Sequence, residues 1–122
     1  MTFAELVDET VSYYRNNPRS KSELLECRYA GPNGERCAVA RLCDESVTDL
    51  EAMDSQSCAA WDDVCHMATL KPEYAHFTME QIQGLQGFHD RDGNWIDPYG
   101  KSGTRGLTVE GKKKAYNLKS RY

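Results

Sequence analysis

The sequence predicts an α+β fold in one compact domain, residues 1–122, with an N-terminal helix, a β-hairpin, several short helices and an aromatic loop. Two observations lead to this prediction. Apolar residues recur with a helical period at the start of the chain, and a Gly-Pro-Asn-Gly turn then separates two short segments of alternating character. The length of 122 residues and the hydrophobic fraction of 39% fit a single core of modest size.

The N-terminal helix is predicted over residues 2–16. Thr2 and Glu5 form a capping-box pattern, in which the hydroxyl accepts from an early amide and the carboxylate bonds back to Thr2. Apolar residues then share one helical face: Phe3, Leu6, Val7, Val11 and Tyr14. Pro18 ends the helix, because proline disfavours a helical conformation in the preceding residue and has no amide donor.

The β-hairpin is predicted at about residues 24–40, around an Asn-Gly pair that tolerates the positive φ angles of a tight turn. Cys27 and Tyr29 share one face of the first strand, because side chains alternate along a strand. Cys37 and Val39 share a face of the second strand in the same way. We expect the thiols to face the core, since free cysteine is among the most buried residue types. A metal held between the two strands is the alternative interpretation.

The middle of the chain is acidic and only weakly helical. Apolar residues from Leu42 to Met53 suggest one acidic helix, and residues 59–68 suggest another that ends before Pro72. Residues 44–63 contain seven carboxylates and no lysine or arginine, whereas the chain from Arg105 onward has six basic residues and one acid. With a net charge of −4, this dipolar chain does not resemble a general DNA-binding protein, whose basic face normally dominates.

The C-terminal third is predicted to contain two helices joined by a loop. The first helix starts at Thr78, because Gln81 completes a second capping box. The loop covers residues 91–105 around Trp95 and is rich in glycine, aspartate, asparagine and proline. The last helix starts at Thr108 and is expected to fade in the lysine run that follows.

We expect a cytoplasmic protein without a secretory leader or a membrane span. The first ten residues carry acids and no basic residue, and no apolar run approaches the roughly 20 residues that a span requires. Thiols stay reduced in the cytoplasm, and five cysteines is an odd number, so a disulfide framework is not expected.

We predict no metal site, no cofactor and no catalytic residue. The cysteines lack the close pairs of zinc modules. The run from Asp90 to Asn94 resembles half of an EF-hand loop, but Trp95 occupies the glycine position and Lys101 the glutamate position. Cys58 and Cys65, with three histidines, offer nucleophile chemistry without a local signature. A small Cys/His hydrolase is therefore only a third alternative.

Several short strings resemble a known group of proteins. They are CRYAGPNGERCAVAR at the turn, LKPEY at residues 70–74, GLQGFHD at the end of a helix, and GLTVEG near the C-terminus. Together they resemble a group of small, largely uncharacterised bacteriophage and bacterial proteins with the signature C-x-Y-x4-G-x2-C-A-V-x-R. The resemblance implies a compact α+β domain and a phage origin, and it transfers no catalytic residue.

The expected function is non-enzymatic binding that counters a host defence. Guanidinium groups bind phosphate oxygens and aromatic faces stack on bases, so we expect sequestration of a phosphate-bearing nucleotide signal. The candidate ligand-binding residues are Arg19, Arg28, Tyr29, Arg36, Arg41, His89 and Trp95. Such a pocket could lie at the subunit interface of a homo-oligomer. The alternative is an inhibitor that uses the acidic surface of residues 44–63 against a host defence protein, with charge accelerating the encounter.

Overall fold

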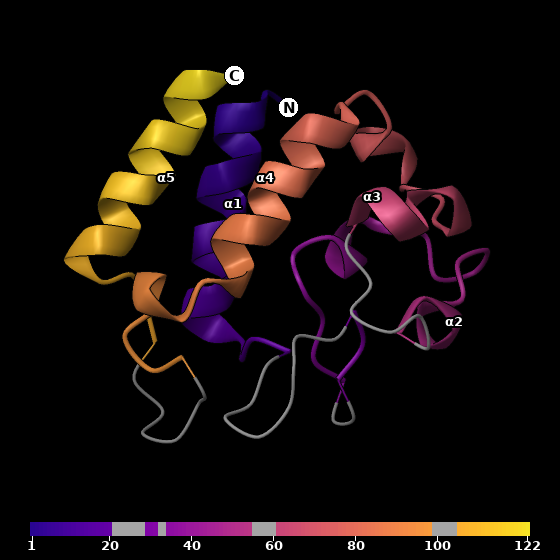
Figure 1. Cartoon of the computed structure of the whole chain (residues 1–122), viewed down its shortest axis with the longest axis horizontal. Helices are drawn as coiled ribbons and strands as arrows, with labels where there is room; N and C mark the ends of the chain where they lie inside the picture. The colour runs from indigo at the N-terminus through magenta and orange to yellow at the C-terminus, as the bar shows by residue number, and fades with distance from the viewer. Residues whose placement is uncertain (21–28, 32–33, 55–60, 99–104) are drawn as a thin grey trace.

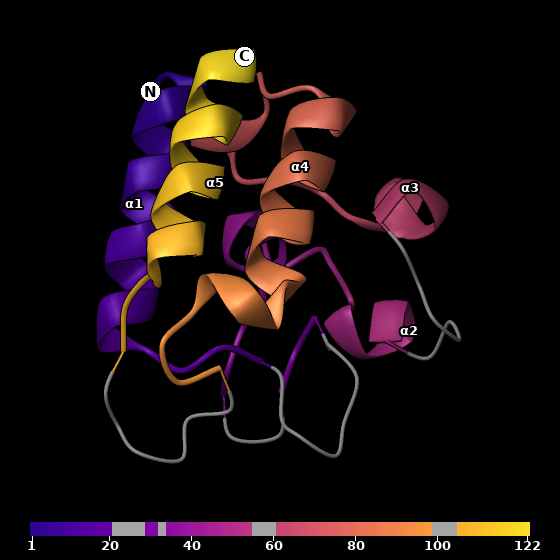
Figure 2. The ribbon, with the colours of Figure 1, turned by 60° about the vertical axis from the view of Figure 1, so that its left-hand side comes forward.

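Three longer helices stand side by side in the computed structural model: α1 (Phe3–Asn16), α4 (Met79–Asp90) and α5 (Val109–Arg121) (Figure 1). The structure describes residues 1–20, 29–31, 34–54, 61–98 and 105–122, without the side chains of residues 62 and 63. Helices α1 and α4 run in the same direction and α5 runs in the opposite one, so both termini lie at the same end of the bundle (Figures 1 and 2).

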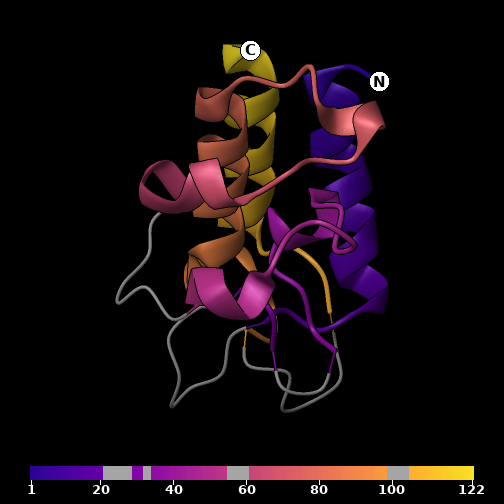
Figure 3. The ribbon, with the colours of Figure 1, turned by 90° about the vertical axis from the view of Figure 1, so that its right-hand side faces the viewer.

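The short elements lie beside this bundle. Figure 3 shows α3 (Trp61–Val64) nearer the end with the termini and α2 (Leu50–Asp54) farther from it. Single turns of 3-10 helix connect the longer elements: η1 (Ala40–Leu42), η2 (Cys65–Met67), η3 (Pro72–Tyr74) and η4 (Asp92–Asn94). Buried apolar side chains from Phe3 to Leu118 form one core cluster. Among the described helices, none combines the length and the apolar character that a membrane crossing requires.

Helices α1 and α4 start where the sequence predicted. The Thr2 hydroxyl accepts from the Glu5 amide at 3.1 Å, and the Thr2 amide donates to the Glu5 carboxylate at 3.0 Å. Thr78 and Gln81 make the same reciprocal pair at the start of α4. Each pair satisfies amides that have no partner within the helix, so these two starts are fixed by side chains only three residues away.

Helix α5 also starts where expected, after Thr108, whose hydroxyl accepts from the Gly111 amide at 3.0 Å. The prediction that it fades in the lysine run is wrong, because the helix continues to Arg121. Ala115 and Leu118 are buried, and Lys119 pairs with Asp8 of α1 at 2.9 Å. Packing against the other helices therefore extends α5 beyond what its own sequence favours.

The predicted α+β class is wrong. Within the described residues no strand forms, and three isolated antiparallel bridges remain: Ala30 with Arg36, Cys43 with Leu70, and Trp95 with Leu107. The predicted second strand of the hairpin instead turns into η1, since Arg41 bonds to the carbonyl of Cys37 and Leu42 to that of Val39. Residues 37–40 are all fully buried, whereas a strand on a two-sided hairpin would alternate. Residues 24–28 lie outside the described part of the chain.

The acidic helix predicted from Leu42 to Met53 is reduced to α2. Asp44 stops the chain from continuing as a helix, because its carboxylate accepts from the amide and the hydroxyl of Ser46. Asp49 then starts α2 by accepting from the Ala52 amide at 3.1 Å. The two aspartates of this segment, Asp44 and Asp49, thus form a turn and a cap.

Two helical glycines are expected to respond in opposite ways to the same change. A Cβ at Gly111 would lie 2.1 Å from the backbone oxygen of Asn94, so Gly111→Ala should lower the free energy of unfolding by at least about 2 kcal/mol. A Cβ at Gly87 would meet nothing within 4 Å, so Gly87→Ala should raise it by up to about 1 kcal/mol. Urea denaturation measures both, and a tolerated alanine at position 111 would contradict the packing of α5 on Asn94.

Candidate functional site

The C-terminal end of α4 is held by the buried side chain of Arg19. Its Nε and Nη2 donate to the carbonyl of His89 at 2.9 and 2.6 Å, and Nη1 donates to the carbonyl of Pro98 at 2.8 Å. Both Nη atoms also lie 3.3 Å from a carboxylate oxygen of Asp92. The last carbonyls of a helix have no partner within it and carry its negative dipole end, so a cation is favourable there. The Arg19 guanidinium therefore acts as a buried cap on α4.

Aromatic rings surround this cap. Trp95 Nε1 donates to the same His89 carbonyl at 3.0 Å, and the Tyr14 ring lies 5.0 Å from the His89 ring and 5.6 Å from that of Trp95. His89 has no exposed surface, and its Nδ1 lies 2.8 Å from Asp90 Oδ1. Burial raises the pKa of the Tyr14 phenol well above its ordinary value, and its hydroxyl donates to the carbonyl of Arg36 at 2.6 Å. His89 and Trp95 therefore belong to the packed core.

Arg41, in η1, pairs with the first helix, α1. Its guanidinium donates to both carboxylate oxygens of Glu9, with Nη1 at 3.0 Å, and stands 4.3 Å above the ring of Tyr13. The Arg41 side chain is only 7% exposed. This arginine joins η1 to the first helix and presents little surface to a ligand.

Arg36 lines a cavity. Its guanidinium donates two parallel hydrogen bonds to Glu45, from Nε at 3.1 Å and from Nη2 at 2.9 Å.

Tyr29 is buried, and its amide donates to Asp54 at 2.6 Å, while Arg28 lies outside the described residues. The structure thus brings Arg19, His89 and Trp95 together inside the core. The ligand-binding role of these residues stays a prediction.

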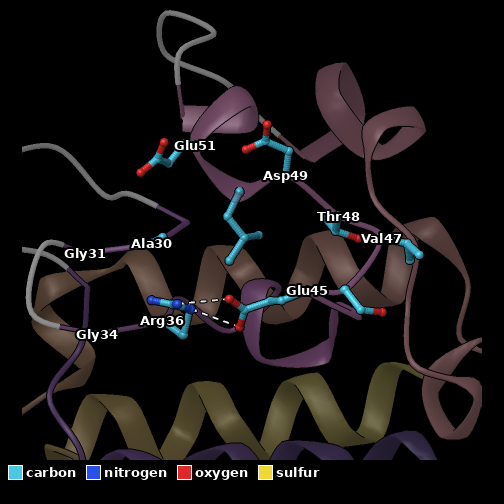
Figure 4. A pocket seen from close by; sticks show the side chains of 11 residues that line it. Ala30, Gly31, Gly34, Arg36, Glu45, Val47, Thr48, Asp49 and Glu51 are labelled. Atoms are coloured by element: carbon cyan, nitrogen blue, oxygen red, sulfur yellow. Dashed lines mark hydrogen bonds and ion pairs between the residues drawn. The ribbon is translucent and has the colours of Figure 1, made fainter.

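We call the cavity beside Arg36 the acidic hollow. Its volume is about 790 Å³, and eleven of the described residues line it, drawn from positions 30–36 and 45–51 (Figure 4). The charged ones are Arg36, Glu45, Asp49 and Glu51, so three carboxylates face one guanidinium. The hollow therefore has a net negative charge, which repels phosphate and attracts cations.

The carboxylates of the acidic hollow are not equivalent. Glu45 is occupied by Arg36, whereas Asp49 and Glu51 stand on the opposite side of the hollow in Figure 4 and make no ion pair with any described residue. Val47, Asp49 and Glu51 are exposed and alternate with buried Thr48 and Leu50. The same backbone run thus buries one face and presents two carboxylates and an exposed valine on the other.

The sequence predicts the acids of this region but not the acidic hollow. It predicts one charged surface over residues 44–63 and a phosphate-binding role for Arg36. The apolar Leu50 between Asp49 and Glu51 indicates a two-sided segment, but the exposure of Val47 and the burial of Thr48 do not follow from the local sequence. Nothing local indicated that Glu45 would neutralise Arg36.

Two of the three described cysteines, Cys37 and Cys43, pack in the core, and Cys65 is partly exposed. Cys37 and Cys43 are buried, and burial raises the pKa of the Cys43 thiol to about 11 and that of Cys37 further. The amide of Ala40 donates to the sulfur of Cys37 at 3.4 Å. The core interpretation is confirmed for Cys37, while Cys27 lies outside the described residues. In the part of the chain that is described, no group of three His, Cys, Asp or Glu side chains is placed to hold a metal ion.

No protein-family model matches this chain, and neither a curated protein nor a solved structure matches it.

Replacing arginine by lysine should destabilise the protein strongly at the buried Arg19 and only weakly at the more exposed Arg36. Arg19→Lys keeps the charge but cannot reach two carbonyls and Asp92 together, so the free energy of unfolding should fall by about 3 kcal/mol. Arg36→Lys, at a more exposed ion pair, should cost less than about 1 kcal/mol. Chemical denaturation gives both values. Similar losses in the two variants would mean that Arg19 does not hold the end of α4.

Thiol modification should follow burial. At about pH 8, iodoacetamide should modify the partly exposed Cys65 in the native protein, and Cys37 and Cys43 only after unfolding, as peptide mass mapping would show. Because the folded pKa of Cys43 is raised from 9.0 to about 11, its contribution to stability is complete below pH 9 and is lost as the pH rises toward 11. Rapid modification of native Cys37 would contradict the packed core.

Proposed function

We propose that this chain is a non-enzymatic binding protein whose acidic hollow binds a basic segment of a protein partner. One observation carries the proposal. The hollow already holds a guanidinium, that of Arg36, in a two-bond pair with Glu45, while Asp49 and Glu51 stand across from it without an ion pair to the described residues. An arginine or lysine of a partner would pair with these two carboxylates in the same way.

The charge of the acidic hollow favours a cationic ligand over a phosphate. A phosphate there would face three carboxylates, and the one arginine is already neutralised. A volume of about 790 Å³ lies within the range of ligand pockets and admits several side chains of an extended segment. The exposed Val47 at the rim adds an apolar contact.

The resemblance to phage proteins supports a host defence protein as the partner. Occupying a basic surface of such a protein would block whatever that surface normally binds, and opposite charges would accelerate the encounter. Sequestration of a nucleotide signal by the arginines at the turn is less well supported, because Arg19 and Arg41 are buried in ion pairs. The proposal needs no catalytic residue.

Titration with a short peptide rich in arginine and lysine tests the proposal, with an acidic peptide of equal length as the negative probe. NMR shifts should concentrate at residues 45–51 and weaken with added salt. The double change Asp49→Asn and Glu51→Gln should reduce affinity at least about tenfold, because it removes both available carboxylates and keeps the cap on α2.

A matched control uses two exposed carboxylates outside the acidic hollow. Glu73→Gln with Glu80→Gln removes the same charge, and the affinity for the basic peptide should change less than about twofold. If both double variants lost the same affinity for the basic peptide, the binding would depend on the overall charge of the protein and not on the acidic hollow. Shifts located away from residues 45–51 would refute the site itself.

A further inference from the structure

A second cavity lies between α4 and α5, and we call it the α4–α5 groove. Its volume is about 240 Å³, and its charged lining residues are Arg91, Lys114 and Arg121. Among the described residues that line the groove, none is a carboxylate. The groove is built by other elements than the acidic hollow and has the opposite charge, so it suits a different ligand.

Two of the cations lie on the same stripe of α5. Lys114 and Arg121 are seven residues apart, which is about two turns, and both are exposed. Neither forms an ion pair with the described residues. Arg91, just after α4, donates to Glu110 at 3.1 Å, but its side chain is 58% exposed and such surface pairs contribute only about 0–1 kcal/mol. A bound anion can therefore recruit all three cations.

One residue that lines the groove, Asn94, has a buried polar atom without a hydrogen-bond partner among the described residues. Asn94 is 1% exposed, and its Nδ2 donates to the carbonyl of Phe88 at 3.0 Å. Its Oδ1 has no hydrogen-bond partner among the described residues, a state that costs stability until a donor arrives. A ligand that carries a hydroxyl or amino group beside its anionic group would match this acceptor.

Space in the groove depends on a glycine. A Cβ at Gly87 would meet nothing within 4 Å, so this position of α4 leaves a gap that a side chain would fill. Glycine inside a helix costs about 1 kcal/mol relative to alanine. The gap therefore lies at a position where the helix itself would favour a larger residue.

We propose that the α4–α5 groove binds a small phosphate-bearing ligand of the sugar-phosphate or nucleotide class. Its phosphate lies on Lys114 and Arg121, with Arg91 joining when it leaves Glu110, and a hydroxyl or amino group donates toward Asn94. Arginine forks and lysine ammonium groups are the usual phosphate ligands of proteins. This inference goes beyond the proposed function and does not depend on the acidic hollow.

Calorimetry and NMR with ATP as the probe test the inference, with inorganic pyrophosphate and a ten-residue oligothymidylate as comparison probes. ATP should bind and shift the signals of Gly87 and Asn94. The double change Lys114→Gln and Arg121→Gln should lower the affinity for ATP at least about tenfold. Lys112→Gln with Lys113→Gln removes the same charge from α5 outside the groove and should change the affinity less than about twofold.

A third variant tests the cavity without altering charge. Gly87→Leu fills the groove and keeps every cation, so it should also weaken ATP at least about tenfold while the melting temperature stays near that of the parent. If both double variants lost the same ATP affinity, or if Gly87→Leu lost none, ATP would be attracted to the charge of α5 in general. Either result would contradict binding in the groove. Binding of the oligonucleotide alone would overturn it as well, as would no binding of ATP.

Discussion

The carbonyl of His89 accepts hydrogen bonds from two other parts of the chain, and it thereby connects three segments of the fold. It accepts from Arg19 and from Trp95, and so it joins the segment after α1, the end of α4 and the loop before α5. A buried guanidinium is costly unless every donor is used, and here five contacts occupy the five N–H donors of Arg19. Its full pairing adds hydrogen bonds between these three segments to the apolar packing of the core.

The arginines at the turn show how tertiary contacts divide residues that look alike in the sequence. Arg19 pairs across 70 positions, Arg41 across 32 and Arg36 across 9, each with a different acceptor. Burial decides their roles, since the first two are almost fully enclosed and the third stays at the rim of a cavity. Arginines that resemble a phosphate site in the sequence thus serve as a helix cap, a tie to α1 and one wall of the acidic hollow.

The acidic and the basic regions of the chain line two separate cavities of opposite charge. Acids at positions 45, 49 and 51 surround the acidic hollow, and the cations of α5 with Arg91 surround the α4–α5 groove. Because opposite charges attract different ligands, a protein segment in one and a phosphate in the other need not compete. The helical bundle supplies the fixed positions on which both cavities depend.

The sequence by itself determined where α1, α4 and α5 start, because the capping residues Thr2, Thr78 and Thr108 act on amides only three positions away. It also indicated the charge of each region. Only the tertiary structure decided that residues 37–40 are buried on every side, which turns a predicted strand into η1. It alone assigned Glu45 to Arg36 and His89 to Arg19, since burial and ion pairing depend on groups far along the chain. Local patterns fix local hydrogen bonds, and the partners of a side chain are fixed by packing.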